Sequence, residues 1–397
     1  MTRLSLLLIL VIVFVNFAGF SLIIPLLPFY GRELRASPIE ITFLFSAYSL
    51  GGIFGEIWWG RASDRHGRRK ILMLATTCTA ITYVAFAFAT NLWIAVVIRI
   101  LTGFFSSTVG VCMSYIADVT RPQERARSMG FLGAAINLGF AIGPAVGGLL
   151  ASPEQGLAGF RLPILISAGV AAIAALWSSF VLVESHAPGA ARPLPKWSAA
   201  IGFVAARGMV ARLFGIAFIG IGAFASMEAV FGLWTQHNFG WSTEQVGTSF
   251  IFVGLTGFLV QILLIGRATR RFGEARVIVA GLAVLAGSMV LQPILRDPVA
   301  AVILMSTLMA GHSIAFPTAG ALISKSTASD MQGSVSGLLM ATNAFGRIVM
   351  PPIFGAAYSG LGPDWSYYSG AVLIGVAVVL ALQIVAMRET APAAKPA

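Results

Sequence analysis

The chain consists of long apolar runs separated by short polar segments, and this feature limits the fold more than any other. About twelve runs reach roughly 20 residues, which is enough for a helix to cross the hydrocarbon core of a bilayer. Only 10% of the 397 residues are charged and 57% are hydrophobic, which excludes an ordinary water-soluble protein. The alternation of barrel strands is absent, so we predict an all-α membrane protein with twelve transmembrane helices.

The polar segments separate the individual spans. We predict spans at residues 4–30, 39–59, 71–89, 92–115, 129–150, 162–183, 209–235, 245–265, 276–295, 299–321, 333–357 and 367–387. With the N-terminus inside, most of the 26 Lys and Arg residues fall on the cytoplasmic side, as the positive-inside rule requires. We therefore expect a multi-pass protein of the inner (plasma) membrane with both termini cytoplasmic. Basic loops facing an anionic leaflet explain the net charge of +11, so we expect no nucleic-acid partner.

The two halves of the chain repeat each other. Four glycine and proline positions recur 207 residues later, namely Gly130, Gly139, Pro144 and Gly148 as Gly337, Gly346, Pro351 and Gly355. Duplicated apolar halves around a central path are typical of transporters. We predict two pseudo-symmetric six-helix bundles, at residues 1–183 and 207–397. A cytoplasmic linker at 184–206, which contains Pro188, Pro193 and Pro195, would join them.

A basic motif is duplicated as well. Residues 60–70 read Gly-Arg-Ala-Ser-Asp-Arg-His-Gly-Arg-Arg-Lys, and residues 266–273 keep the glycine spacing with Arg270 in place of Asp64. This motif resembles the signature loop between the second and third helices of the major facilitator superfamily. The resemblance implies a cytoplasmic conformational lock that breaks when the halves rock apart, formed by Gly60, Asp64, Arg65, Gly67, Arg68 and Asp118. Alternatively the charges only set topology, which is our interpretation of Arg61, Arg69 and Lys70.

The predicted fifth span carries a glycine and proline pattern. Proline bends a helix, and glycines on one face allow another helix to slide or pack closely. The pattern resembles the antiporter motif of drug:proton exporters within the superfamily, and its positions are Gly130, Gly139, Gly143, Pro144, Gly147 and Gly148. The resemblance extends to tetracycline:proton antiporters over nearly the whole chain. Two acids of those exporters correspond to Asn16 and about Leu285, which argues against tetracycline itself as the substrate.

A few charged side chains fall within predicted spans, where charge is costly, and these are candidates for proton coupling. Arg99 resembles the intramembrane arginine of proton-coupled members of the superfamily. Glu228 is the best-placed carboxylate and Glu56 is the second choice, because burial favours the neutral form and permits proton exchange near neutral pH. The structural alternatives are backbone carbonyls around Arg99 and a Glu228 pair with Arg347. A lone His312 is better explained by packing.

Polar side chains within spans are candidates for a substrate cavity, and we name Asn16, Asn137, Asn343 and Arg347. Cys78 and Cys112 lack metal-ligand spacing, and no nucleotide-binding loop or hydrolase motif is present, so we expect no metal, cofactor, ATP or enzymatic activity.

We predict a monomeric proton-coupled efflux antiporter that exports a small amphiphilic drug or metabolite by alternating access. Its partners would be that small-molecule substrate, protons and the lipid bilayer. An importer or facilitator of the same fold and a lipid flippase remain alternatives, and a non-transporting membrane sensor or an enzyme is the weakest alternative.

Overall fold

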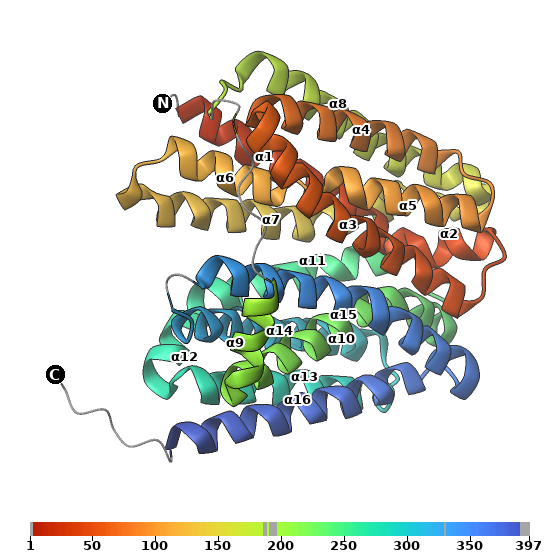
Figure 1. The fold of residues 1–397 in the computed structure, drawn as a ribbon. Coiled ribbons are helices and arrows are strands. Elements are labelled where there is room, and N and C mark those ends of the chain that lie inside the picture. Colours follow the sequence, from red (N-terminus) through yellow and green to blue (C-terminus); the bar gives the residue numbers. More distant parts are fainter. Residues whose placement is uncertain (1–2, 186–188, 190–196, 329–330, 390–397) are drawn as a thin grey trace. The chain divides into compact units, whose positions relative to one another are not determined.

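The computed structural model describes residues 3–185, 189, 197–328 and 331–389. All regular elements among these residues are helices, which confirms the predicted all-α class (Figure 1). Eleven helical segments of the described chain are long and apolar enough to cross a membrane. The remaining predicted span, 333–357, lies in α15 (Gln332–Leu361), a 30-residue helix whose Gly, Ser, Thr and Pro content lowers its hydropathy.

Contacts along the chain define two compact units. Unit 1 comprises Met1–Pro193 and Glu228–Gly254, and unit 2 comprises Leu194–Met227 and Leu255–Ala397. The bundles expected at 1–183 and 207–397 stay a prediction. Much of the expected linker at 184–206, including its three prolines, lies outside the described residues, and its last part forms α9 (Trp197–Ala206).

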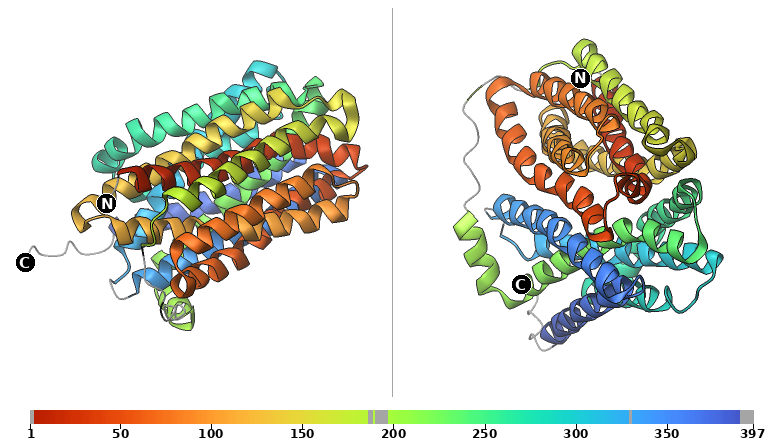
Figure 2. Two further views of the ribbon diagram at one scale, coloured as in Figure 1. Left: turned by 90° about the horizontal axis from the view of Figure 1, so that it is seen from above. Right: turned by 90° about the vertical axis from the view of Figure 1, so that its right-hand side faces the viewer.

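Unit 1 is built on long helices that run beside one another (Figure 2). In chain order they are α1 (Arg3–Ile23), the short η1 (Ile24–Leu26), α2 (Leu27–Glu33), α3 (Pro38–His66), α4 (Arg68–Ala87), α5 (Leu92–Ser106), α6 (Val109–Val119), α7 (Pro122–Leu150), η2 (Pro153–Phe160) and α8 (Arg161–Val181). Helix α1 packs mainly against α7 and α8, α3 against α5, and α4 against α8. Their apolar side chains form a core that includes Ile12, Trp59 and Tyr115.

Local sequence explains where α3 begins. The Ser37 hydroxyl accepts a hydrogen bond from Glu40 N, and the Glu40 carboxylate accepts one from Ser37 N at 2.8 Å. This capping box satisfies two backbone donors that the helix itself cannot pair, and Pro38 supplies the φ angle of a first helical residue.

Helix α10 (Gly208–Phe239) and α11 (Thr243–Leu259) each contribute residues to both units. The rest of unit 2 contains η3 (Val260–Leu264), α12 (Ile265–Phe272), α13 (Glu274–Leu291), α14 (Pro298–Lys325), α15 and α16 (Trp365–Glu389). Helix α13 packs against α14 and α16, and α15 packs against α16 and α9. At the crossing of α13 and α14, a Cβ on Gly311 would lie 2.5 Å from Gly281 O, so the two backbones meet directly.

Two details differ from the sequence-based expectation. The predicted loop at 60–70 is wrong, because residues up to His66 continue α3 and Arg68 already begins α4. The fourth predicted span, 92–115, is not one continuous helix, because Ser107 and Thr108 leave helical geometry and separate α5 from α6.

Candidate functional site

A single glycine makes the turn between α3 and α4. Gly67 has φ +94° and ψ 147°, a backbone conformation open to glycine and costly for other residues. The turn places the last residues of α3 next to the first residue of α4, Arg68. The basic motif is therefore a helix end, a one-residue turn and a helix start.

Arg68 lies at the centre of a buried charge network, with only 1% of its surface exposed. Its Nη1 lies 3.0 Å from Asp64 Oδ1, and its Nε donates to Asp118 Oδ2 at 2.9 Å. Nη1 also donates to Ser63 Oγ at 2.8 Å. The guanidinium thus ties together α3, α4 and the end of α6.

The structure brings together three of the six predicted lock residues through their side chains, namely Asp64, Arg68 and Asp118. Gly67 contributes through its backbone. Gly60 has open space around the position of a Cβ, and Arg65 is exposed, so neither residue lies in the buried network.

Glu184, just after α8, is part of this network, and the sequence analysis missed its role. Its Oε1 accepts a hydrogen bond from Arg68 N at 2.7 Å, and its Oε2 accepts one from Arg69 N at 3.3 Å. The carboxylate therefore caps the start of α4, where Gly67 offers no side chain. Two sequence features could have indicated this role. The residue before α4 is a glycine, which has no side chain to cap the helix, and Glu184 is a carboxylate that directly follows the apolar run of the sixth predicted span.

The first residues of the linker also contact the lock. Ser185 Oγ donates to Asp118 Oδ2 at 3.4 Å, and Gly189 N donates to Asp64 O at 3.3 Å. Together with Glu184, these contacts connect the described part of the linker to both acids of the network.

The glycines of the predicted antiporter motif place α7 directly on α1. A Cβ on Gly139 would lie 2.8 Å from Ala18 N, one on Gly143 would lie 2.5 Å from Ala18 O, and one on Gly147 would lie 2.0 Å from Leu22 O. Ser21 Oγ adds a hydrogen bond to Gly139 O at 2.9 Å. These glycines are four residues apart and share one helix face.

The other motif residues face elsewhere. Gly148 and the carbonyl of Pro144 contact Gly247 of α11, which belongs to the same unit. Gly130 has nothing within 4 Å of a Cβ position, so close packing does not explain it. The motif therefore serves two helix contacts within unit 1, with Gly130 outside both.

Arg99 on α5 is held by aromatic rings and one carbonyl. Its Nε donates to Leu44 O at 3.2 Å, and its guanidinium carbon lies 4.8 Å from the centre of the Tyr48 ring. The rings of Phe20 and Phe86 lie at 5.9 and 5.8 Å. Nη1 is buried and has no hydrogen-bond partner among the described residues. The arrangement keeps a cation inside the unit mainly through ring faces.

Glu56 of α3 lies at the start of α6, at the break in the fourth span. Its Oε1 accepts a hydrogen bond from Gly110 N at 2.8 Å, and a Cβ on Gly110 would come within 2.5 Å of that oxygen. Asn16 Nδ2 donates to Thr108 Oγ1 at 3.4 Å, one residue before α6 begins. The first turn of α6 thus receives a carboxylate from α3 and an amide from α1, where the helix dipole favours negative charge.

The remaining candidates are distributed over the two units. Glu228, on α10, belongs to unit 1 and is 6% exposed. Asn137 on α7 is also in unit 1, whereas Asn343 and Arg347 lie on α15 in unit 2, and all three are half-buried. His312, in unit 2, lies between Phe224 and Phe316, with ring centres at 4.1 and 4.6 Å. Each unit therefore carries part of the polar set expected for a cavity.

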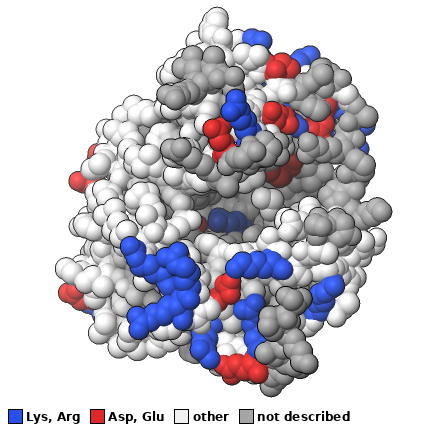
Figure 3. Space-filling model, turned by 90° about the vertical axis from the view of Figure 1, so that its left-hand side faces the viewer, with Lys and Arg blue, Asp and Glu red and all other residues white. Residues whose placement is uncertain are grey.

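Each unit carries exposed basic side chains, as Figure 3 shows. In unit 1 the end of α3 and the start of α4 supply Arg65, Arg69 and Lys70, and in unit 2 the end of α12 supplies Arg270 and Arg271. Among the described residues, no group of three or more His, Cys, Asp or Glu could hold a metal ion.

Comparisons with known proteins identify relatives over almost the entire chain. Residues 9–336, and again 213–397, match the family described as Major Facilitator Superfamily. The tetracycline resistance protein, class C, of Escherichia coli is 32% identical, with 91% of each chain covered. Multidrug resistance protein 2 of Bacillus subtilis (strain 168) is 26% identical, over 93% of this chain and 91% of the relative.

Solved structures share the fold at lower identity. A bacterial homolog of the human lysosomal transporter Spinster, in an inward-facing and occupied conformation, superposes with a TM-score of 0.79. It is 16% identical, and 98% of each chain is covered. This likeness concerns the fold alone.

Proposed function

Because the chain belongs to the major facilitator superfamily, we propose that it is a proton-coupled efflux antiporter exporting a small amphiphilic drug or metabolite by alternating access. Family membership confirms the resemblance first noticed in the basic motif, and it identifies a multi-pass membrane transporter rather than an enzyme. The names of the relatives, tetracycline resistance protein and multidrug resistance protein, support export of a drug-like compound.

The burial of Glu228 is the observation that carries proton coupling. Glu228 lies in a membrane helix with 6% of its surface exposed, and ionisable residues buried within membrane spans mark proton and ion pathways. In the proposed cycle Glu228 takes a proton from outside and releases it inside. Substrate occupies the cavity during the opposite half of the cycle, in which it moves from inside to outside. Substrate and proton then compete through that carboxylate.

Arg99 and Glu56 have supporting parts in this proposal. The buried Arg99 cation tunes the electrostatics of unit 1. Glu56 is the alternative proton acceptor to Glu228, and its protonation would weaken the contact that its carboxylate makes with Gly110 N at the start of α6. We propose that Asn16 and Asn137 of unit 1 contact the substrate, and that Asn343 and Arg347 of unit 2 do so as well.

The buried network around Arg68 is proposed as the cytoplasmic conformational lock. Three elements meet at one guanidinium, so separating them breaks two ion pairs at once. The glycine face of α7 allows α1 and α7 to shift against each other with little steric cost. We further propose the inner (plasma) membrane, cytoplasmic termini and a monomeric state, in keeping with the basic residues at the end of α3 in unit 1 and at the end of α12 in unit 2.

Substrate-triggered proton movement tests the proposal. Purified protein in liposomes with a trapped pH-sensitive dye would be challenged with cationic, neutral and zwitterionic amphiphiles. We expect at least one compound to release protons, and Glu228→Gln to abolish that response because glutamine carries no exchangeable charge. Glu244→Gln, an exposed position at the start of α11, serves as the matched control and should respond like the wild type.

The outcomes separate the alternatives. An unchanged response in Glu228→Gln would remove Glu228 from the mechanism, and loss of the response in Glu56→Gln alone would move the proton to Glu56. If folded protein responds to no compound, a lipid flippase or a narrow metabolite carrier replaces the drug antiporter.

A further inference from the structure

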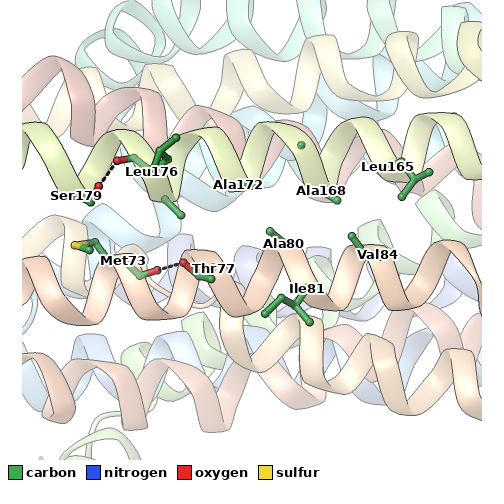
Figure 4. Close-up of a pocket in the computed structure, with 12 residues that line it drawn as sticks. Met73, Thr77, Ala80, Ile81, Val84, Leu165, Ala168, Ala172, Leu176 and Ser179 are labelled. Carbon is green, nitrogen blue, oxygen red and sulfur yellow. Dashed lines mark hydrogen bonds between the residues drawn. The ribbon is translucent and has the colours of Figure 1, made fainter.

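A groove of about 710 Å³ runs between α4 and α8 on unit 1 (Figure 4). Its walls are residues 73–84 of α4 and residues 165–179 of α8. Small side chains on α8, such as Ala168, Gly169 and Ala172, leave this space between two helices that otherwise pack together. A Cβ on Gly169 would meet nothing within 4 Å, so the groove is open at that point.

The surface of the groove is apolar. Its two hydroxyl groups are already bonded within their own helices, Thr77 Oγ1 to Met73 O at 2.8 Å and Ser179 Oγ to Leu176 O at 2.5 Å. Figure 4 shows both bonds. The rim is also apolar and exposed, with Ile81 and Leu176 each 62% exposed. A polar solute would find no partner here, whereas a hydrocarbon chain would lose nothing on entering.

The length of the groove matches one leaflet of a bilayer. From Met73 to Val84, α4 rises about 16 Å at the pitch of an α-helix. Half of the hydrocarbon core of a bilayer is about 15 Å thick. One acyl chain, lying along the helices, has the length that the groove provides.

A charged side chain stands at one end of the groove. Arg69, in the first turn of α4, donates from Nη2 to Ser179 O at 2.5 Å, and Ser179 lines the groove. Its Nε is buried and has no hydrogen-bond partner among the described residues. Lys70 follows it and is exposed. The charged guanidinium thus lies at the point where a chain leaving the groove would carry its headgroup.

We propose that the groove between α4 and α8 binds one acyl chain of an anionic phospholipid and that Arg69 holds the phosphate. The apolar, open walls favour an acyl chain, and the length of the groove sets how far that chain extends into the bilayer. The cation at the end of the groove favours a negatively charged headgroup. Positive charge at the groove end and a hydrophobic exposed rim both match a lipid at the membrane surface. The site is independent of the proposed proton and substrate path.

Native mass spectrometry of the full-length protein tests this assignment. Protein released from detergent would be titrated with phosphatidylglycerol and with phosphatidylcholine carrying identical acyl chains. The wild type should retain one phosphatidylglycerol with about fivefold tighter binding than phosphatidylcholine, the effect of one cation near an anionic headgroup. Arg69→Gln should lower binding of phosphatidylglycerol to the level of phosphatidylcholine, because chain binding survives and headgroup recognition does not.

A variant that fills the groove provides a second test of the lipid-binding proposal. Gly169→Phe places a ring in the open space and should abolish retention of both lipids. Gly375→Phe on α16 is the matched control, since Gly375 also has no neighbour within 4 Å of a Cβ, and it should bind like the wild type. The melting temperature of each variant verifies folding. Unchanged retention in folded Gly169→Phe, or equal retention of the two lipids by the wild type, would overturn the proposal.

Discussion

Gly67 and Gly273 occupy equivalent places in the two repeats, and each ends one helix and begins the next with a positive φ, +94° and +78°. Next to Gly67 lies a buried ion-pair network, with Arg68 only 1% exposed between Asp64 and Asp118. Around Gly273 the ion pairs are at the surface. There Glu274 pairs with Lys325 at 2.5 Å and with Arg388 at 3.4 Å, and these cations are 66% and 42% exposed.

The comparison shows that both repeats keep the glycine turn between two helices, while the ion pairs around the turn differ. The turn between two spans needs a glycine in both halves, since its φ is costly for other residues. Arg270 stands where the first half has Asp64, and the acid of the second copy, Glu274, pairs with Lys325 and Arg388 on other helices. Because removing one partner of a buried ion pair is costly and breaking an exposed pair is not, we propose that the first copy, rather than the second, holds the conformational preference.

The largest contrast should come from removing the cations. Arg68→Ala leaves Asp64 and Asp118 without their buried partner and should destabilise the protein by about 3 to 5 kcal/mol. Lys325→Ala removes one exposed partner of Glu274 and should cost about 1 kcal/mol or less, because solvent screens that pair. Thermal unfolding in detergent, with both variants in one buffer, measures the difference. Equal shifts of the melting temperature would contradict the contrast.

A smaller contrast should come from the two turn glycines. Gly67→Ala and Gly273→Ala both force an alanine into a glycine conformation, at a cost of about 1 to 3 kcal/mol each. Only at Gly67 would the added Cβ also lie 2.4 Å from the Glu184 carboxylate, while nothing lies within 4 Å at Gly273. Gly67→Ala should therefore unfold at the lower temperature. In the Glu184→Ala background the same substitution should cost less, because the steric part is gone, and an equal cost in both backgrounds would mean that backbone strain alone explains the effect.

The smallest expected effect concerns the cap of α4. Glu184→Gln keeps the shape but removes the charge that accepts from Arg68 N and Arg69 N, and it should cost about 1 kcal/mol. Glu389→Gln, in the exposed pair with Arg276, provides the comparison and should leave the melting temperature nearly unchanged. Hydrogen exchange at the first turn of α4 reports the cap locally, and faster exchange should appear in Glu184→Gln only.

The sequence predicted the parts of this structure that depend on local pattern. Long apolar runs predict the all-α class, and the class is confirmed. Asp64 and Arg68 are four residues apart, a spacing that favours contact on a helix. The predicted loop was wrong because the basic residues of 60–66 are as compatible with a helix end as with a loop, and only Gly67 forces a turn.

Contacts between distant segments were beyond a single sequence. The role of Glu184 depends on α8 ending beside the start of α4, which no local pattern encodes. Likewise, the polar triplet Ser106-Ser107-Thr108 interrupts the run at 92–115, but small polar residues also occur inside continuous membrane helices, so the triplet did not specify the break. The side chains that contact the start of α6 are Glu56 and Asn16, which come from α3 and α1.

Transport kinetics of Asp64→Asn against Glu274→Gln test the central contrast between the repeats most directly. With a substrate identified by proton release, binding affinity and the maximal rate of proton-coupled transport would be measured for folded protein in liposomes. We predict that Asp64→Asn lowers the maximal rate about tenfold, equivalent to 1.4 kcal/mol in the barrier, and leaves affinity almost unchanged. Glu274→Gln should leave both near wild type. Equal rates for the two variants would show that the buried network does not control switching.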